Sequence, residues 1–145
     1  METLVRAVTV NVLIANGDAH GKNFSLLHDP SGALRIAPLY DLLSTLAYGD
    51  DRLAMYVDEV RRTNRVTADR IVNEAARWGV SRARASEIIA ETLDRVPDAA
   101  QVARDETDGV PAGVLRVIDS QLIQLRSVPP VKPTAAVNVS PAEPS

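Results

Sequence analysis

The chain of 145 residues contains no cysteine and only two histidines. The absence of cysteine excludes disulfides, zinc–thiolate centres and iron–sulfur clusters, and two histidines are too few for a histidine-rich metal cluster. The sequence also lacks an apolar run of the roughly 20 residues that a membrane-spanning helix needs. Residues 1–16 have neither the basic start nor the small-residue cleavage site of a signal peptide. We therefore expect a cytoplasmic protein that is not associated with a membrane.

Charge and composition are those of one globular domain of ordinary size. The formal net charge is −3 at pH 7, and this negative balance disfavours direct binding to nucleic acid. Five of the nine prolines fall within residues 128–145, where large side chains are almost absent. We expect a folded domain over residues 1–127 and a disordered, proline-rich tail over residues 128–145.

The first part of the chain indicates a helix followed by a short hairpin. Apolar residues recur at helical steps between Leu4 and Ala15, although their β-branched side chains leave a strand as the alternative. Two short strand-like runs follow at residues 24–27 and 34–36, separated by the turn sequence D-P-S-G at residues 29–32. This hairpin would return the chain to the segment that precedes it.

The rest of the chain, beyond Leu46, indicates only helices. A capping hydroxyl can start a helix, and a glycine or a proline can end one. The three expected helices open near Thr67, at Ser81 and near Pro111, and they stop at Gly79, at Pro97 and near Ser127 respectively. The predicted fold class is therefore mainly α, with one small β-hairpin.

The segment N-G-D-A-H-G-K-N, from Asn16 to Asn23, has the residue types of a phosphotransfer site. Phosphoryl transfer needs a carboxylate that orients the attacking hydroxyl and oxygen ligands that hold Mg²⁺ against nucleotide phosphates. Asp18 and Asn23 have the Asp-to-Asn step of a kinase catalytic loop, and the P-L-Y-D ending at Asp41 could complete the metal site. On spacing alone, a turn that caps a helix is the commoner explanation of such a segment.

The full strings G-D-A-H-G-K-N-F-S-L-L and L-R-I-A-P-L-Y-D-L-L-S-T resemble the C-terminal catalytic core of the HipA-like serine/threonine kinases, the toxin halves of bacterial toxin–antitoxin pairs. The resemblance covers residues 4–125 and is most specific over residues 16–45. It implies a kinase-like C-lobe with a small β-hairpin at the catalytic edge, ATP as phosphate donor, Mg²⁺, and a protein substrate with a Ser or Thr hydroxyl. Asp18 then resembles the catalytic base, and Asn23 and Asp41 resemble the metal ligands.

His20 and Lys22 match further catalytic-loop positions of the family motif. His20 is either a packing residue that hydrogen-bonds a backbone carbonyl or a carboxylate such as Asp41, or a group that transfers a proton. We favour packing because Asp18 already fills the position of the base. Lys22 either neutralises charge on the transferred phosphoryl group or is solvated, and the family match favours the first role.

The resemblance also implies a part that this sequence does not supply. A kinase of this family needs an N-terminal lobe with a loop over the phosphates and a lysine that pairs with them. Here the first glycine, Gly17, and the first lysine, Lys22, already belong to the catalytic loop. We therefore expect a C-lobe that is inactive alone and that either works with a separate N-lobe polypeptide or is a truncated remnant. The family also implies an antitoxin protein as partner.

A second interpretation concerns residues 75–86, A-A-R-W-G-V-S-R-A-R-A-S. Their spacing is typical of a helix-turn-helix unit, with Arg82 and Arg84 near the start of a presumed recognition helix. Acidic residues close by oppose DNA binding, because phosphate contacts dominate affinity for DNA. A DNA-binding or interaction module without catalysis is therefore the alternative, and burial of that helix against the core would exclude it.

Overall fold

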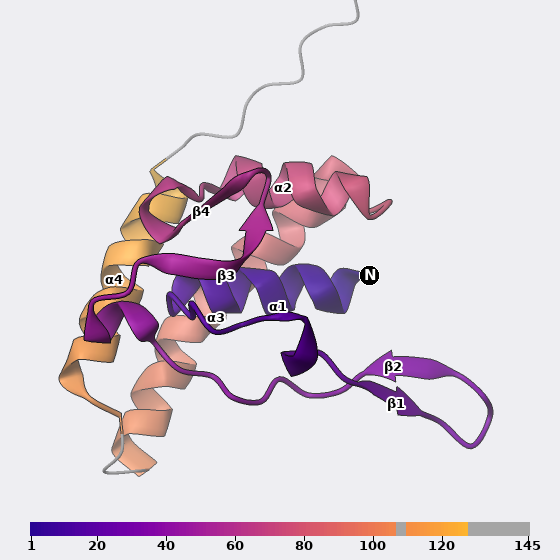
Figure 1. The fold of residues 1–145 in the computed structure, drawn as a ribbon, viewed down its shortest axis with the longest axis horizontal. Helices are drawn as coiled ribbons and strands as arrows, with labels where there is room; N and C mark the ends of the chain where they lie inside the picture. The colour runs from indigo at the N-terminus through magenta and orange to yellow at the C-terminus, as the bar shows by residue number, and fades with distance from the viewer. Residues whose placement is uncertain (107–109, 128–145) are drawn as a thin grey trace, which may run out of the picture.

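Four helices, two β-hairpins and three short 3₁₀ turns make up the computed structural model, which describes residues 1–106 and 110–127 (Figure 1). The helices are α1 (Glu2–Leu13), α2 (Ala68–Arg77), α3 (Arg82–Glu106) and α4 (Ala112–Arg126). The hairpins pair β1 (Leu26–His28) with β2 (Leu34–Ile36) and β3 (Arg52–Val57) with β4 (Val60–Arg62). The 3₁₀ turns are η1 (Gly21–Asn23), η2 (Thr45–Tyr48) and η3 (Thr63–Arg65). The predicted class, mainly α with a small hairpin, is confirmed.

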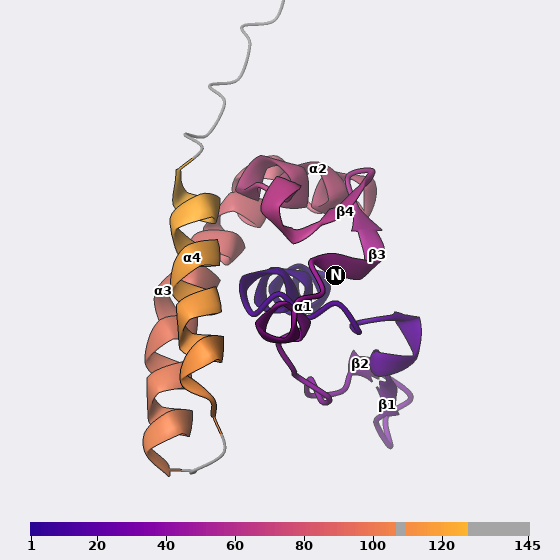
Figure 2. The ribbon, with the colours of Figure 1, turned by 60° about the vertical axis from the view of Figure 1, so that its left-hand side comes forward.

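Helix α1 lies in the hydrophobic core. Its residues Val5, Val12 and Leu13 are buried, and it packs against α2, α3 and α4. Helices α3 and α4 run side by side and form one flank of the molecule (Figure 2). Ile88 of α3 and Leu125 of α4 are buried in the same core. The opening segment is thus a helix as predicted, and the strand alternative is wrong.

The predicted starts of α2 and α3 follow from their capping hydroxyls. Thr67 Oγ1 accepts a hydrogen bond from the N–H of Arg70 at 3.3 Å, and Ser81 Oγ accepts one from the N–H of Arg84 at 3.3 Å. After α2, Gly79 has a φ of +82°, which glycine adopts without steric cost. These boundaries confirm the predicted ones.

The predicted hairpin forms and extends away from the body of the protein (Figure 1). Strands β1 and β2 pair antiparallel, with Leu26 opposite Ile36, and His28 at the end of β1 is exposed. In the turn, Asp29 Oδ1 accepts a hydrogen bond from the N–H of Ser31 at 2.9 Å. This bond lowers the pKa of Asp29, because it stabilises the ionised carboxylate.

The prediction of only helices beyond Leu46 is wrong, because β3 and β4 form a second hairpin there. Its two-residue turn consists of Asp58 and Glu59, whose φ angles of 45° and 68° are positive, as a type I′ turn requires. The Asp58 carboxylate accepts hydrogen bonds from Asn73 Nδ2 and Arg77 Nη2 of α2, both at 3.0 Å. Contacts with α2 therefore hold a turn that lacks glycine.

Helix α3 continues through Pro97 to Glu106, so the prediction that Pro97 ends it is wrong. Proline has no N–H, which leaves the carbonyl of Leu93 without its usual partner in the helix. That carbonyl accepts a hydrogen bond from Arg126 Nη2 of α4 at 3.4 Å, and the same guanidinium pairs with Asp94. The neighbouring helix thus supplies the donor that the proline lacks.

Helix α4 corresponds to the third predicted helix and ends at Arg126, next to the domain boundary predicted at residue 127. The tail predicted over residues 128–145 lies outside the described residues. Among the residues that the structure describes, no helix is both long and apolar enough to cross a membrane.

Candidate functional site

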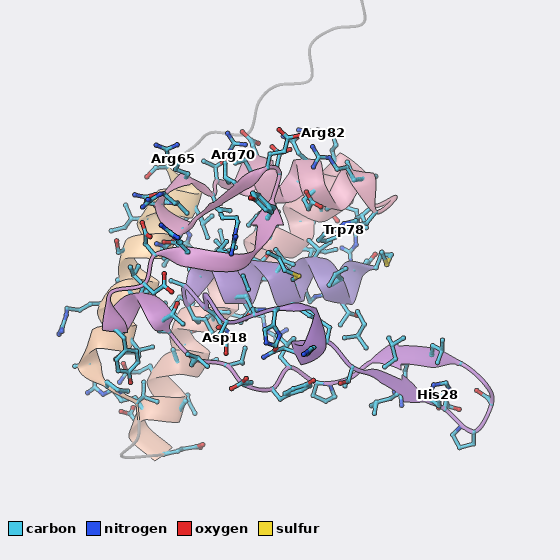
Figure 3. All side chains as sticks on the ribbon, in the orientation of Figure 1. Asp18, His28, Arg65, Arg70, Trp78 and Arg82 are labelled. Carbon is cyan, nitrogen blue, oxygen red and sulfur yellow. The ribbon has the colours of Figure 1, made fainter. Side chains whose placement is uncertain are left out.

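The segment from Asn16 to Asn23 leaves the end of α1, passes Asp18 and η1, and leads into β1 (Figure 3). Helix α1 ends because Ala15 has a φ of +51° and the N–H of Asn16 donates to the carbonyl of Asn11 at 2.8 Å. The hairpin β1–β2 then returns the chain toward this segment. Both parts of the motif therefore meet beside the end of the central helix.

The two predicted metal ligands contact each other directly. Asn23 Nδ2 donates a hydrogen bond to Asp41 Oδ2 at 3.0 Å across 18 residues of sequence. Asn23 is buried, whereas Asp41 is exposed and has an unusual φ of +57°. A half-turn of the Asn23 amide would present Oδ1 in place of Nδ2, and the pair would then offer oxygen atoms to one cation.

This pair suits a cation that takes most of its ligands from elsewhere. No group of three His, Asp or Glu side chains that could hold a metal gathers within residues 1–106 and 110–127. Mg²⁺ commonly binds through one or two protein oxygen ligands, with water and phosphate oxygens completing its octahedron. The chemistry of Asn23 and Asp41 therefore fits Mg²⁺ whose remaining ligands are water or phosphate oxygens.

The other predicted site residues lie on the same loop with exposed side chains. The Asp18 carboxylate lies 3.9 Å from Nε2 of His20, and the two side chains are 58% and 47% exposed. The carboxylate beside His20 is therefore that of Asp18, whereas the carboxylate of Asp41 is hydrogen-bonded to Asn23. Lys22 is exposed too, and its carbonyl accepts a hydrogen bond from the hydroxyl of Tyr40 at 2.7 Å. An accessible carboxylate and an accessible ammonium are thus placed on one loop.

Thr45 of η2 holds the backbone of this loop, a role that sequence reasoning missed. Its Oγ1 accepts a hydrogen bond from the N–H of Gly17 at 2.8 Å and donates one to the carbonyl of Ala15 at 3.1 Å. A Cβ on Gly17 would lie 2.3 Å from the carbonyl oxygen of Arg52 and 2.5 Å from Thr45 Oγ1. Glycine is therefore required where the loop passes between η2 and β3.

Asn16 is a second residue to which sequence reasoning assigned no role. It is buried, and its carboxamide contacts both the backbone of Asp18 and the backbone of Asp41. Its place inside the family motif is the one signal that could have drawn attention to it. Spacing could not, because the contact with Asp41 spans 25 residues of sequence.

The geometry of the presumed helix-turn-helix unit opposes DNA binding. Ala85 and Ile88 of α3 are buried in the core. Arg84 donates from Nε and Nη2 to the carboxylate of Glu2, at 2.9 and 2.8 Å, and Arg82 donates to Asn73 Oδ1 at 2.7 Å (Figure 3 labels Arg82). The arginines that would contact DNA are engaged within the protein, and the helix is packed on the core.

Comparison with known proteins yields one family. The model of the HipA-like C-terminal domain matches residues 1–100. The chain is 38% identical over 111 residues to "Putative kinase Y4mE" of Sinorhizobium fredii, which covers 72% of this chain and 26% of that protein. It is 43% identical over 60 residues to "Serine/threonine-protein kinase toxin HipA" of Shewanella oneidensis, which covers 40% of this chain and 14% of that protein. The chain thus spans about a quarter or less of the length of these relatives.

A solved structure shows the same fold. A chain in the complex of HipA, HipB and operator DNA from Shewanella oneidensis matches with a TM-score of 0.65 and 25% sequence identity. The match covers 87% of this chain and 30% of that one. The fold therefore agrees with the family that the sequence comparison identifies.

Proposed function

Because the chain belongs to the HipA-like C-terminal domain family, we propose that it carries the catalytic loop of an ATP-dependent protein serine/threonine kinase that acts in the cytoplasm. The contact between Asn23 and Asp41 supports this proposal best. It brings together two side chains with the chemistry of magnesium ligands, one of which, Asn23, lies on the same loop as the exposed carboxylate of Asp18.

In this proposal each residue of the loop has a separate task. Asp18 orients the Ser or Thr hydroxyl of a protein substrate and accepts its proton, while His20 restrains the Asp18 carboxylate. Asn23 and Asp41 hold Mg²⁺, which neutralises charge on the phosphates of ATP when it is bound. Lys22 approaches the transferred phosphoryl group as a further positive charge.

The proposed kinase needs a nucleotide-binding lobe that the described residues do not form. We propose that this lobe, on a separate polypeptide or on the rest of a longer chain, supplies the loop and the lysine that hold the ATP phosphates. Leu26, Leu27 and Leu34 of the hairpin β1–β2 are 57%, 45% and 56% exposed, and they offer apolar surface for such a contact. An antitoxin protein is the second proposed partner, since the similar solved structure contains HipA together with HipB.

Transfer of labelled phosphate from ATP tests the proposal. The assay uses the chain alone, the chain with the N-lobe of a related kinase, and the same mixture with Asp18→Ala, each with a protein Ser/Thr acceptor. We expect no phosphorylation by the chain alone, because the nucleotide is not positioned. We expect activity in the mixture, and a loss of about 100-fold or more with Asp18→Ala, the usual scale for removal of a general base.

Asp119→Ala on α4 is the matched control, because it removes an exposed carboxylate that is not part of the loop and should leave activity unchanged. Activity of the chain alone would contradict the requirement for a second lobe. Activity of the mixture that survives Asp18→Ala would contradict the role given to Asp18.

A further inference from the structure

Two buried carboxamides, Asn11 and Asn16, lie behind the exposed residues of the site. Asn16 is only 1% exposed, and its Nδ2 donates to Asn11 Oδ1 at 3.0 Å and to the carbonyl of Asp41 at 3.2 Å. Its Oδ1 accepts a hydrogen bond from the N–H of Asp18 at 3.1 Å. Both donor hydrogens and the acceptor of this side chain are therefore engaged.

Asn11 connects this arrangement to the central helix. Its Nδ2 donates to the carbonyl of Ala7 at 3.0 Å, one turn earlier in α1, and this bond directs Oδ1 toward Asn16. Because α1 is packed on three helices, its backbone is a rigid reference for the loop. A continuous path of hydrogen bonds leads from that helix to Asp18 and to Asp41.

Asp41 depends on support of this kind. Its φ of +57° is one that residues with a Cβ adopt rarely, and such conformations persist where surrounding contacts impose them. The hydrogen bond from Asn16 to the Asp41 carbonyl is such a contact. The same conformation directs the Asp41 carboxylate to Asn23.

We propose that Asn16 is a positioning residue that fixes the Asp41 backbone relative to Asp18, and thereby places the metal-binding carboxylate opposite the catalytic one. The metal-binding and catalytic roles of Asp41 and Asp18 rest on the function proposed above, whereas the effect of Asn16 on the Asp41 backbone rests on the hydrogen bonds alone. Asparagine is suited to the task because aspartate has no donors for the Asp41 carbonyl, and because glutamine is longer.

The substitution Asn16→Asp tests this inference in the full chain, since it conserves shape, removes the two donors that bind Asn11 and Asp41, and replaces the amide by a carboxylate. Two readouts are followed by NMR: the backbone φ of Asp41 from scalar couplings, and Mn²⁺ binding from paramagnetic broadening at Asn23 and Asp41. We expect Asp41 to leave its positive φ and the Mn²⁺ affinity to fall about tenfold or more, as is typical when a residue that supports a metal ligand is changed. The N–H of Asp18 should stay protected from exchange, because Oδ1 is retained.

Thr9→Val is the matched control. Thr9 is also buried in α1, but its hydroxyl donates to the carbonyl of Val5, away from the loop. This variant should keep both the Asp41 conformation and the Mn²⁺ affinity. Equal losses with Thr9→Val and Asn16→Asp would indicate general destabilisation and overturn the inference.

Asn11→Leu provides a second test that does not bury a charge. It removes the acceptor that orients Asn16 while keeping a helix-forming side chain, and we expect the same changes at Asp41 to a smaller degree. Retention of the positive φ in both variants would overturn the inference. If the unsubstituted chain shows no broadening by Mn²⁺ at Asn23 and Asp41, the proposed metal site fails, whereas the φ of Asp41 still decides the role of Asn16.

Discussion

Non-glycine residues with a left-handed backbone conformation occur at the candidate site and in the turn of β3–β4. Within the described residues, the non-glycine residues with positive φ are Ala15, Asp41, Asp58 and Glu59. Each such conformation costs about 1–2 kcal/mol for a residue with a Cβ. The first two flank the candidate site, and the last two form the turn of β3–β4. Hydrogen bonds to α2 offset this cost at Asp58, whereas Glu59 has less to offset it.

Replacing Glu59 by glycine should therefore stabilise the protein. The Glu59 side chain is 86% exposed, and its ion pair with Arg77 at 3.9 Å contributes little at the surface. We expect Glu59→Gly to raise the free energy of unfolding by about 0.5 kcal/mol, after the greater freedom of glycine in the unfolded chain is counted. Urea denaturation measures the change. Asp58→Gly is the comparison and should be destabilising, because it removes the carboxylate that α2 binds; equal losses in the two variants would contradict the argument.

At the scale of elements, structure that depends on neighbouring residues could be predicted from the sequence, and structure that depends on distant residues could not. Thr67 and Ser81 predict the starts of α2 and α3, because a capping hydroxyl binds N–H groups of its own helix. The hairpin β3–β4 was missed because its turn at residues 58–59 has no glycine and is held by α2. Pro97 was expected to end α3 because the donor that replaces its N–H, on Arg126, belongs to another helix.

In the candidate site, too, some residues could be predicted from the sequence and others could not. Asp18, Asn23 and Asp41 could be identified as candidates from the motif and its resemblance to a known family. Asn16 and Thr45 could not, because the contact of Asn16 with Asp41 spans 25 residues of sequence and the contact of Thr45 with Gly17 in the loop spans 28. Residues that would carry out chemistry are thus visible in the sequence, while those that hold them in place become visible only in the fold.

The continuity of α3 through Pro97 predicts an energetic coupling with α4. Arg126→Gln should cost about 1 kcal/mol in the natural background, because it leaves the Leu93 carbonyl without a donor. In a Pro97→Ala background the same change should cost less, since the restored N–H binds that carbonyl. We expect a coupling energy of about 0.5–1 kcal/mol from a double-mutant cycle measured by thermal unfolding. Asp94→Asn, which affects only the ion pair of Arg126, should have the same effect in both backgrounds; strict additivity of Arg126→Gln and Pro97→Ala would contradict the account.

At the scale of the whole molecule, an ion pair joins the beginning of α1 to α3. Arg84 donates two hydrogen bonds to the Glu2 carboxylate, which is 82 residues away in sequence. The hydrogen bond from Arg84 lowers the pKa of Glu2 from its usual 4.5, and the same bond raises the pKa of Arg84. Because the pKa of Glu2 is lower in the folded state, its contribution is fully present above the unfolded value and is lost as the pH falls through the folded one.

A pH series should show this contribution. We expect Glu2→Gln to lower the midpoint of thermal unfolding at pH 7, and the difference from the natural chain to shrink as the pH falls from about 4.5 through the lower pKa that Glu2 has in the folded state. High salt should reduce the difference, since the pair is partly exposed. Asp119→Asn, on the exposed face of α4, should show no such pH dependence. A difference between Glu2→Gln and the natural chain that is constant with pH would exclude the ion pair as its cause.

The contacts of Asn16 and Gly17 also bear on how the protein ages chemically. An asparagine followed by glycine is prone to deamidation. In this reaction the backbone nitrogen of the glycine attacks the side-chain carbonyl carbon of the asparagine, which closes a ring and releases ammonia. Hydrolysis of that ring yields aspartate or isoaspartate. In the folded chain the Gly17 nitrogen donates its hydrogen to Thr45 Oγ1, and the Asn16 amide is held by three hydrogen bonds. The fold thus keeps the Gly17 nitrogen from attacking the side-chain carbonyl carbon of Asn16. Unfolding exposes both groups. Each time the chain unfolds, Asn16 can therefore be converted irreversibly into aspartate or isoaspartate, whose side chain has no donor for the Asp41 carbonyl.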